Sequence, residues 1–418
     1  MFELHTAACN GLADHVGALL SRGSVDIDQR GPNGFTPLMI AAGAGHVRIV
    51  KMLVNKGANV SYVGGAGGTA LHGSAQGGHV AVAKLLVNAG ADLEVAAPSG
   101  GSTPLHMAAE NGHTAVVDLL IEAGANPNSR AAYGLTPLHK AAFNGHVSSI
   151  KLLVRAGANA LLTYSRPKTL TRVALDFASQ EGHVKVVRQL IEEYGIEGCA
   201  GASGGLDALQ LAARDEHVDI MAVLRDAGVF DTGQVLHLAA ERRLEASVKF
   251  LLQQKDIPGS GGIAFFGFLE RLLGRTPLLC AIDGTSPRIV RMLVDAGADT
   301  ASPVGLTKPD GTVAFSVNPL TYASVMLRDK TVRANAATEE QLFSLKAIQR
   351  LLFRVEAVRA ESWLWASDVP SPTSAAAERT KKITTTSTSL TSMLPILRRR
   401  AQRTTLLSTA LFRISKKL

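Results

Sequence analysis

The chain has 418 residues, of which 46% are apolar, and its 43 lysine and arginine residues outnumber its 35 acidic residues. This length and apolar content are sufficient for a large buried core. Ten of the basic residues and none of the acidic ones lie from Arg379 onward, so the preceding body is close to neutral. We therefore expect the body to make no direct contact with nucleic acid, which needs a basic stripe. Since no run of 18 apolar residues occurs, we expect no membrane-spanning helix.

The first predicted helix begins near Met1, where an LHxAAxxG pattern starts at Leu4. Residues 1–20 include Glu3 and Asp14 and lack the basic start and apolar core of a secretory signal, so we expect a protein that is not secreted. The cysteines show no metal-binding spacing, which favours free thiols in a reducing compartment and a nuclear or cytoplasmic location. They are Cys9, Cys199 and Cys280.

A TPLH tetrapeptide or a close variant recurs with its threonine at Thr36, Thr69, Thr103 and Thr136. The steps between copies are 33, 34 and 33 residues. In the copy at residues 102–133, the hydroxyl of Thr103 is a predicted helix cap and Pro104 the first helical residue, with the helix ending at Gly112. A second apolar period predicts another helix that ends before Gly124. Each unit is therefore predicted to contain two helices followed by a polar loop.

The T-P-L-H-x-A motif with a period near 33 residues resembles the ankyrin repeat. The resemblance implies an all-α fold, an ankyrin-repeat α-solenoid of helix-turn-helix units with short hairpin loops. Single units of this size bury their apolar faces against their neighbours. We predict about ten units within residues 1–366. Residues 367–418 are predicted to be a disordered basic tail, because serine, threonine and basic residues dominate them.

Beyond residue 160 the motif weakens but continues, with units predicted to open near Val173, Asp207, Val235, Thr276 and Asn318. The insert at 257–274 is unusually apolar for a loop. It fits either a short helix that packs on the solenoid or a segment that docks a partner. Residues 339–365 place apolar side chains on one helical face, which predicts a terminal helix that covers the end of the stack and shows a polar outer side.

Eleven of the twelve histidines occupy two repeated places, the end of the tetrapeptide and the position after the inter-helix glycine. The resemblance implies that both are structural, with imidazoles bonded to hydroxyl or backbone groups. Residues 201–205 formally fit the G-x-S-x-G elbow of hydrolases, but the polar residues 192–194 precede them where a buried strand is required. We therefore expect no catalytic residue, no metal ligand, no cofactor and no small-molecule substrate.

Ankyrin proteins typically bind a protein partner on a concave face, which the hairpin tips and the exposed positions of the first helices line together. Carried over position by position, the resemblance implies tip contacts by Arg30, Asn33, Phe35, Tyr62, Arg130, Tyr133 and Leu135. On the first helices it implies contacts by Met107, Glu110, Asn111, Lys140, Phe143 and Asn144. Tyr133, Phe143 and Lys140 are the strongest candidates because they fall in regular, adjoining repeats.

The tail contains a basic cluster typical of a nuclear-import signal, formed by Arg398, Arg399, Arg400 and Arg403. A solvated charge run, or a basic amphipathic segment that contacts a membrane surface, is the alternative. The predicted function is a non-catalytic interaction scaffold or adaptor, with a nuclear transcription co-regulator that acts through protein contacts as its specific form. The alternative is a regulatory subunit or substrate adaptor of a ligase or kinase complex, or a membrane-surface adaptor.

Overall fold

The computed structural model describes residues 3–23, 25–31, 33–65, 67–165, 171–230, 233–253, 276–300, 304–307, 313–332 and 339–366. The insert at 257–274 and the tail at 367–418 lie outside these residues. Contacts divide the chain into two compact units, Met1–Arg354 and Val355–Leu418. The domain boundary predicted after residue 366 stays a prediction.

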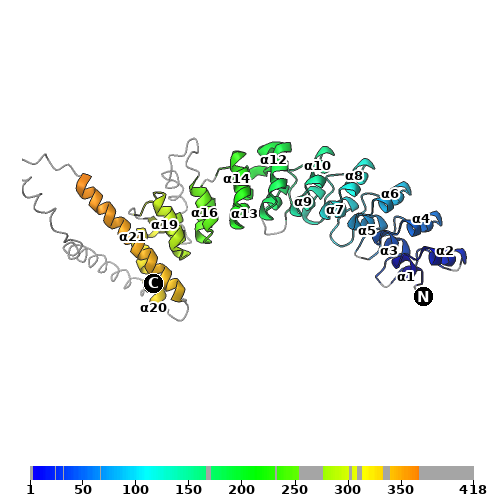
Figure 1. Cartoon of the computed structure of the whole chain (residues 1–418), viewed down its shortest axis with the longest axis horizontal. Helices are drawn as coiled ribbons and strands as arrows, with labels where there is room; N and C mark the ends of the chain where they lie inside the picture. The colour runs from blue at the N-terminus through cyan, green and yellow to red at the C-terminus, as the bar shows by residue number, and fades with distance from the viewer. Residues whose placement is uncertain are drawn as a thin grey trace, which may run out of the picture. The chain divides into compact units, whose positions relative to one another are not determined.

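The described residues form ten successive helix pairs, called here repeats 1 to 10. The first helices of repeats 1 to 5 are α1 (Glu3–Cys9), α3 (Pro37–Gly43), α5 (Ala70–Gly77), α7 (Pro104–Glu110) and α9 (Pro137–Phe143). Those of repeats 6 to 10 are α11 (Ala174–Gln180), α13 (Leu206–Arg214), α15 (Gln234–Glu241), α18 (Pro277–Asp283) and α20 (Pro319–Val332). Each of these helices contacts the first helix of the next repeat, so they form one layer (Figure 1).

The second helices form the other layer. They are α2 (Ala13–Ser21), α4 (Val47–Asn55), α6 (Val80–Asn88), α8 (Thr114–Glu122), α10 (Val147–Arg155), α12 (Val184–Cys199), α14 (Val218–Asp226), α16 (Glu245–Leu252), α19 (Pro287–Asp295) and α21 (Glu339–Ala366). From α2 to α16, each contacts the second helix of the next repeat. This two-layered stack confirms the predicted all-α ankyrin-repeat solenoid.

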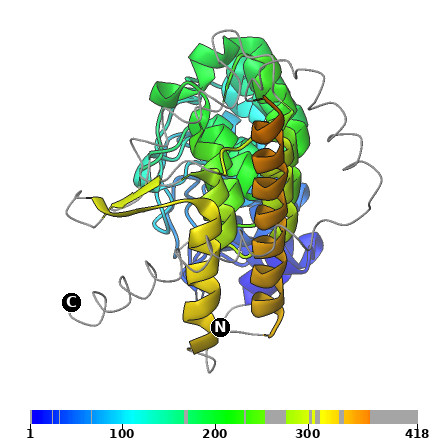
Figure 2. The same ribbon diagram turned by 90° about the vertical axis from the view of Figure 1, so that its left-hand side faces the viewer.

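The described residues also include one short β-hairpin, which the sequence did not predict. Strands β1 (Val304–Thr307) and β2 (Val313–Val317) pair antiparallel, with an irregularity in register between Leu306 and Thr307. Figure 2 shows this ribbon leading into α20. The hairpin therefore occupies the long connection between repeats 9 and 10.

The first helices that follow a complete tetrapeptide begin directly after its threonine, as predicted. The hydroxyl of Thr36 accepts the backbone N–H of Met39, and Thr276 caps α18 in the same way. Proline follows each threonine at the first helical position, where its missing N–H costs nothing. The alanines at the helix centres, such as Ala108 and Ala109, are fully buried and let adjacent first helices approach closely.

The inter-helix histidines join each repeat to the one before it. Each donates from Nε2 to a carbonyl at the C-terminal end of the preceding first helix. The pairs are His46 with Cys9 (3.0 Å), His79 with Gly43 (3.0 Å), His113 with Gln76 (2.9 Å), His146 with Glu110 (3.0 Å), His183 with Phe143 (2.8 Å) and His217 with Gln180 (3.0 Å). The bonds satisfy carbonyls that a helix end leaves without an intrahelical partner.

The glycine before each inter-helix turn makes room for the next repeat's imidazole. A Cβ at Gly112 would lie 2.5 Å from Nδ1 of His146. In repeat 7, Glu216 takes the place of this glycine with a φ of 57°. The following repeat then has Leu244 where the histidine would stand. The two residues therefore occur together because a side chain at the glycine position would collide with the imidazole ring.

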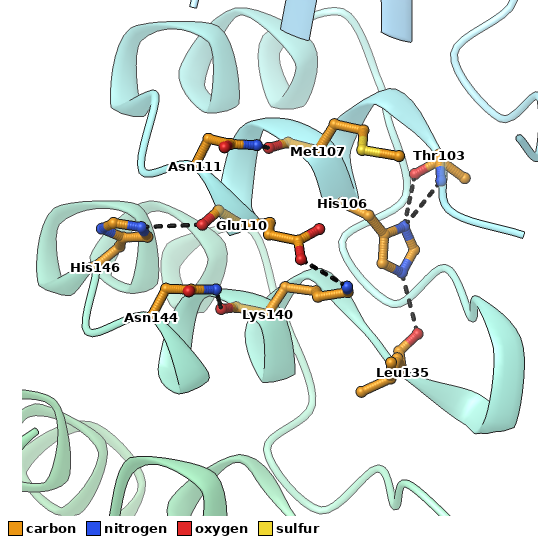
Figure 3. Close-up of polar contacts among 9 residues, drawn as sticks. All are labelled: Thr103, His106, Met107, Glu110, Asn111, Leu135, Lys140, Asn144 and His146. Atoms are coloured by element: carbon orange, nitrogen blue, oxygen red, sulfur yellow. Dashed lines mark hydrogen bonds and ion pairs between the residues drawn. The ribbon is translucent and has the colours of Figure 1, made fainter. Parts of the chain in front are cut away.

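Three of the tetrapeptide histidines, His5, His72 and His106, bond to a carbonyl of the next repeat on the opposite side of the first helices. His106 donates from Nε2 to the carbonyl of Leu135 at 3.0 Å, in the next repeat. Its Nδ1 therefore accepts the backbone N–H and hydroxyl of Thr103, at 3.2 and 2.9 Å (Figure 3). Burial lowers the pKa of His106 to about 4, so the ring is neutral, as this donor and acceptor pattern requires.

The terminal helix is formed as predicted, but its outer side is not uniformly polar. Leu345, Ile348 and Leu352 are buried, and Nε2 of Gln349 donates to the hydroxyl of Ser324 on α20 at 3.0 Å. On the outer side, however, the described residues include two exposed aromatic side chains. These are Phe343, 74% exposed, and Phe353. The apolar period therefore predicted the buried positions Leu345, Ile348 and Leu352 correctly, but it also predicted Val358 on this face, and Val358 is 65% exposed. The prediction of a polar outer side was wrong.

The paired glycine and histidine give a direct test of how the repeats are joined. Gly112→Ala should lower the free energy of unfolding by about 1 to 3 kcal/mol more than Gly124→Ala, because only the first methyl group overlaps an imidazole. Both glycines have positive φ, 69° and 95°, but nothing lies within 4 Å of a Cβ at Gly124. The measurement is urea unfolding of the two variants followed by circular dichroism. Equal losses would show that the imidazole contact does not restrict this position.

Candidate functional site

Exposed and half-buried residues of α7 and α9 form a row that an ion pair connects. Nζ of Lys140 lies 2.9 Å from Oε1 of Glu110, so an ion pair links the two helices (Figure 3). Asn111 and Asn144 each donate to a carbonyl of their own helix, at 2.8 and 3.0 Å. Met107 is half-buried beside them. The structure therefore brings together the first-helix residues that the sequence predicted.

The loops before α9 and α11 approach the same row. Nη2 of Arg130 donates to the carbonyl of Thr163 at 3.1 Å, which ties one loop to the next. Tyr133 has a φ of 59° and is 51% exposed. Leu135 is half-buried, and its carbonyl holds His106. These predicted tip residues thus lie in two loops that are bonded to each other.

An aromatic cluster, formed by Tyr133, Phe143, Tyr164 and Phe177, joins the loops to the helices. The ring centroids of Phe143 and Phe177 are 6.1 Å apart, those of Tyr164 and Phe177 are 5.5 Å apart, and those of Tyr133 and Tyr164 are 6.2 Å apart. All three pairs meet edge to face, the arrangement that ring quadrupoles favour. Phe143 remains 43% exposed and Phe177 is buried, so the cluster has a fixed base and exposed edges.

Sequence reasoning missed Tyr164, Phe177 and Arg172. The carbon Cζ of Arg172 lies 5.9 Å from the centroid of Phe177, within reach of a cation–π contact. Phe177 occupies in repeat 6 the place that Lys140 occupies in repeat 5. Extending the first-helix pattern by one repeat would have found it. Tyr164 and Arg172 carried no such signal, because the loop between repeats 5 and 6 is longer than the loops between the earlier repeats.

The remaining predicted tip residues lie in earlier loops and form a separate group. Cζ of Arg30 lies 5.1 Å from the centroid of Tyr62. Phe35 is half-buried, and a Cβ at Gly67 would lie 2.9 Å from its ring. Asn33 is exposed. None of the three ring pairs of the cluster includes these residues, so the prediction divides into two groups, one at repeats 1 to 3 and one at repeats 4 to 6.

The inter-helix histidines also fix the backbone at the last residues of α7, α9 and α11. The carbonyls of Glu110, Phe143 and Gln180 accept the bonds from His146, His183 and His217. The side chains of the same three residues take part in the ion pair, the aromatic cluster and the bond to Arg172. The backbone that carries these three side chains is therefore held by the hydrogen bonds that join the repeats.

Within the described residues, no group of three histidine, cysteine or acidic side chains is arranged to hold a metal ion. None of the helices in this part of the chain has the length and hydropathy needed to cross a membrane. Arg398, Arg399, Arg400 and Arg403 lie outside the described residues.

The model of the ankyrin repeats matches residues 4–97, 94–164 and 175–260, which together make up more than half of the chain. The chain belongs to the ankyrin-repeat family. Ankyrin repeats are protein-interaction modules, so this ankyrin-repeat chain has a general role in protein–protein interaction. A curated relative, Delta-latroinsectotoxin-Lt1a of Latrodectus tredecimguttatus, is 54% identical over 43 residues. That stretch covers 10% of this chain and 4% of the relative.

Repeat 6 of this ankyrin-repeat chain has Asp176 where the tetrapeptide histidine would stand. Its Oδ2 accepts the backbone N–H of Val173 at 2.9 Å, while Oδ1 is buried without a hydrogen-bond partner. Burial raises the pKa of Asp176 to about 7, and the charge of Asp207 adds to the rise. In the folded protein the carboxyl group of Asp176 therefore stays protonated up to near-neutral pH, whereas the carboxyl group of an unfolded aspartate loses its proton near pH 4.

This raised pKa predicts a loss of stability as the pH rises. Between about pH 4 and 7, the wild type should lose up to about 4 kcal/mol of unfolding free energy relative to Asp176→Asn, which carries no titrating group. Thermal or urea unfolding at several pH values measures the difference. Asp118→Asn, which removes an exposed carboxyl from α8, gives the baseline. A constant difference between wild type and Asp176→Asn across this range would contradict the assignment.

Proposed function

We propose that this protein is a non-catalytic scaffold that binds a protein partner on the face formed by α7, α9, α11, the loop before α9, and the described residues 156–165 and 171–173 of the loop before α11. This face is called here the recognition face. In an ankyrin stack this face is the concave one. The exposed edges of the aromatic cluster are the observation that supports the choice of repeats 4 to 6. Partly exposed aromatic rings on a fixed base lose little conformational entropy on binding and are frequent hot spots.

Truncating the exposed rings tests the recognition face. Tyr133→Ala with Phe143→Ala should weaken partner binding by about 2 kcal/mol per ring, because each truncation removes an aromatic anchor. The intact chain is first used to capture and identify a partner, whose affinity for the double variant is then measured by titration calorimetry. Phe230→Ala removes a ring that is 41% exposed beyond repeat 7 and serves as the matched control. If the double variant binds as tightly as the control, the partner binds elsewhere.

The finer role that we propose is a transcription co-regulator in the nucleus that acts through protein contacts. It is supported by the basic cluster of the tail and by the near-neutral body, which offers no basic stripe for nucleic acid. The alternative is a substrate adaptor of a ligase or kinase complex. The captured partners separate the two: transcription factors fit the first role, and ligase or kinase components fit the second.

The location of the chain in the cell tests the role of the tail. A fluorescent fusion of the full chain should accumulate in the nucleus, and replacing Arg398, Arg399, Arg400 and Arg403 by alanine should make it even across the cell, because import receptors read clustered basic charge. Confocal imaging of both fusions measures the ratio of nuclear to cytoplasmic fluorescence. An even distribution of the unchanged chain would contradict the nuclear role, and enrichment at a membrane would indicate the membrane-surface alternative.

A further inference from the structure

We infer that the recognition face selects a partner segment in which an acidic side chain stands beside an apolar one. This inference rests on the proposed function and specifies the chemistry of its partner. Two observations support it. The first is which cations of the face take part in ion pairs, and the second is that apolar rings lie beside these cations.

Lys140 is the cation of the face whose charge is already matched, because it forms the ion pair with Glu110. Arg130 is different. It is exposed, and its Nη2 donates to the neutral carbonyl of Thr163 at 3.1 Å. Within the described residues Arg130 takes part in no ion pair. A guanidinium has five N–H donors, so most of its donors remain available.

Arg172 is held in a similar way. Its Nη1 donates to the amide oxygen of Gln180 at 2.6 Å, and Nε2 of Gln180 donates in turn to Glu181 at 2.8 Å. The neutral amide therefore stands between the guanidinium and this carboxylate. The charge of Glu181 also helps to raise the pKa of Arg214, on which Asp215 has the larger effect. In the part of the chain that the structure describes, Arg172 lies in no ion pair.

The two arginines belong to adjoining parts of one surface. Arg130 is bonded to Thr163, the neighbour of Tyr164, and the backbone of Tyr164 pairs with that of Arg172. Tyr133 and Phe143 belong to the same aromatic cluster as Tyr164, and their rings remain partly exposed. A carboxylate is the group that a guanidinium binds with two parallel hydrogen bonds. A segment with acidic and apolar side chains therefore matches this surface, whereas a basic segment is repelled.

Four labelled synthetic peptides of equal length test the inference against the full chain by fluorescence anisotropy. One alternates glutamate with phenylalanine, one lysine with phenylalanine, one glutamate with serine, and one serine with phenylalanine. The glutamate–phenylalanine peptide should bind at least about tenfold more tightly than each of the others, and raising the salt concentration should weaken it because exposed charges are screened. Equal or tighter binding of the lysine–phenylalanine peptide, or no measurable binding of any peptide, would overturn the inference.

Charge reversal locates the binding. Arg130→Glu with Arg172→Glu should weaken the binding of the glutamate–phenylalanine peptide by about tenfold or more, since each change replaces attraction by repulsion. Arg155→Glu with Arg188→Glu, which reverses two exposed cations of α10 and α12, is the matched control and should leave the affinity unchanged. Circular dichroism checks the fold of each variant. If the Arg172 change unfolds repeat 6, Arg130→Glu alone should still weaken binding by about threefold.

The lysine variants Arg130→Lys and Arg172→Lys should keep most of the affinity, because they preserve the charge. Equal weakening by both charge-reversal pairs would overturn the inference. The proposed function fails separately: if the captured partner depends on Tyr133 and Phe143 but is unaffected by reversal of both arginines, the recognition face is correct and the acidic partner is wrong.

Discussion

The fold depends on one hydrogen bond that is repeated from repeat to repeat, from an imidazole Nε2 to the last carbonyls of the preceding first helix. A single helix pair cannot bury its apolar face, so its neighbours must complete its core. The imidazole fixes how one pair sits on the next, and glycine at the preceding turn leaves space for the ring. Buried alanines then allow the first helices to pack closely along the layer.

This bond also links stability to recognition. The residues at the C-terminal ends of α7, α9 and α11 give their carbonyls to the stack and their side chains to the surface. Side chains on regular elements can be held with more precision than those on free loops. The surface chemistry can therefore vary from repeat to repeat while the backbone beneath it stays the same. In repeats 7 to 9 the inter-helix glycine is replaced. Glu216, Arg243 and Thr285 stand at this position and adopt the positive φ that glycine has in the other repeats.

The sequence predicted most of the fold because the period and the capping residues are local signals. The ten pairs, the helix starts at Thr36 and Thr276, and the buried leucines and isoleucine of α21 all follow from residue type and spacing. The hairpin β1–β2 and the exposed Phe343 did not follow, since neither belongs to the repeated pattern. The face was predicted only in part. Single positions such as Phe143 could be transferred from the family pattern, but the aromatic cluster depends on which loops meet in space.

Hydrogen exchange of the full chain with and without a captured partner tests the central claim most directly. Exchange should slow in α7, α9, α11 and the loops before α9 and α11, because these elements form the bound face. The second helices α8, α10 and α12 should exchange at unchanged rates, since they lie in the other layer of the stack. Slowing confined to the second helices, or to repeats outside 4 to 6, would contradict the account.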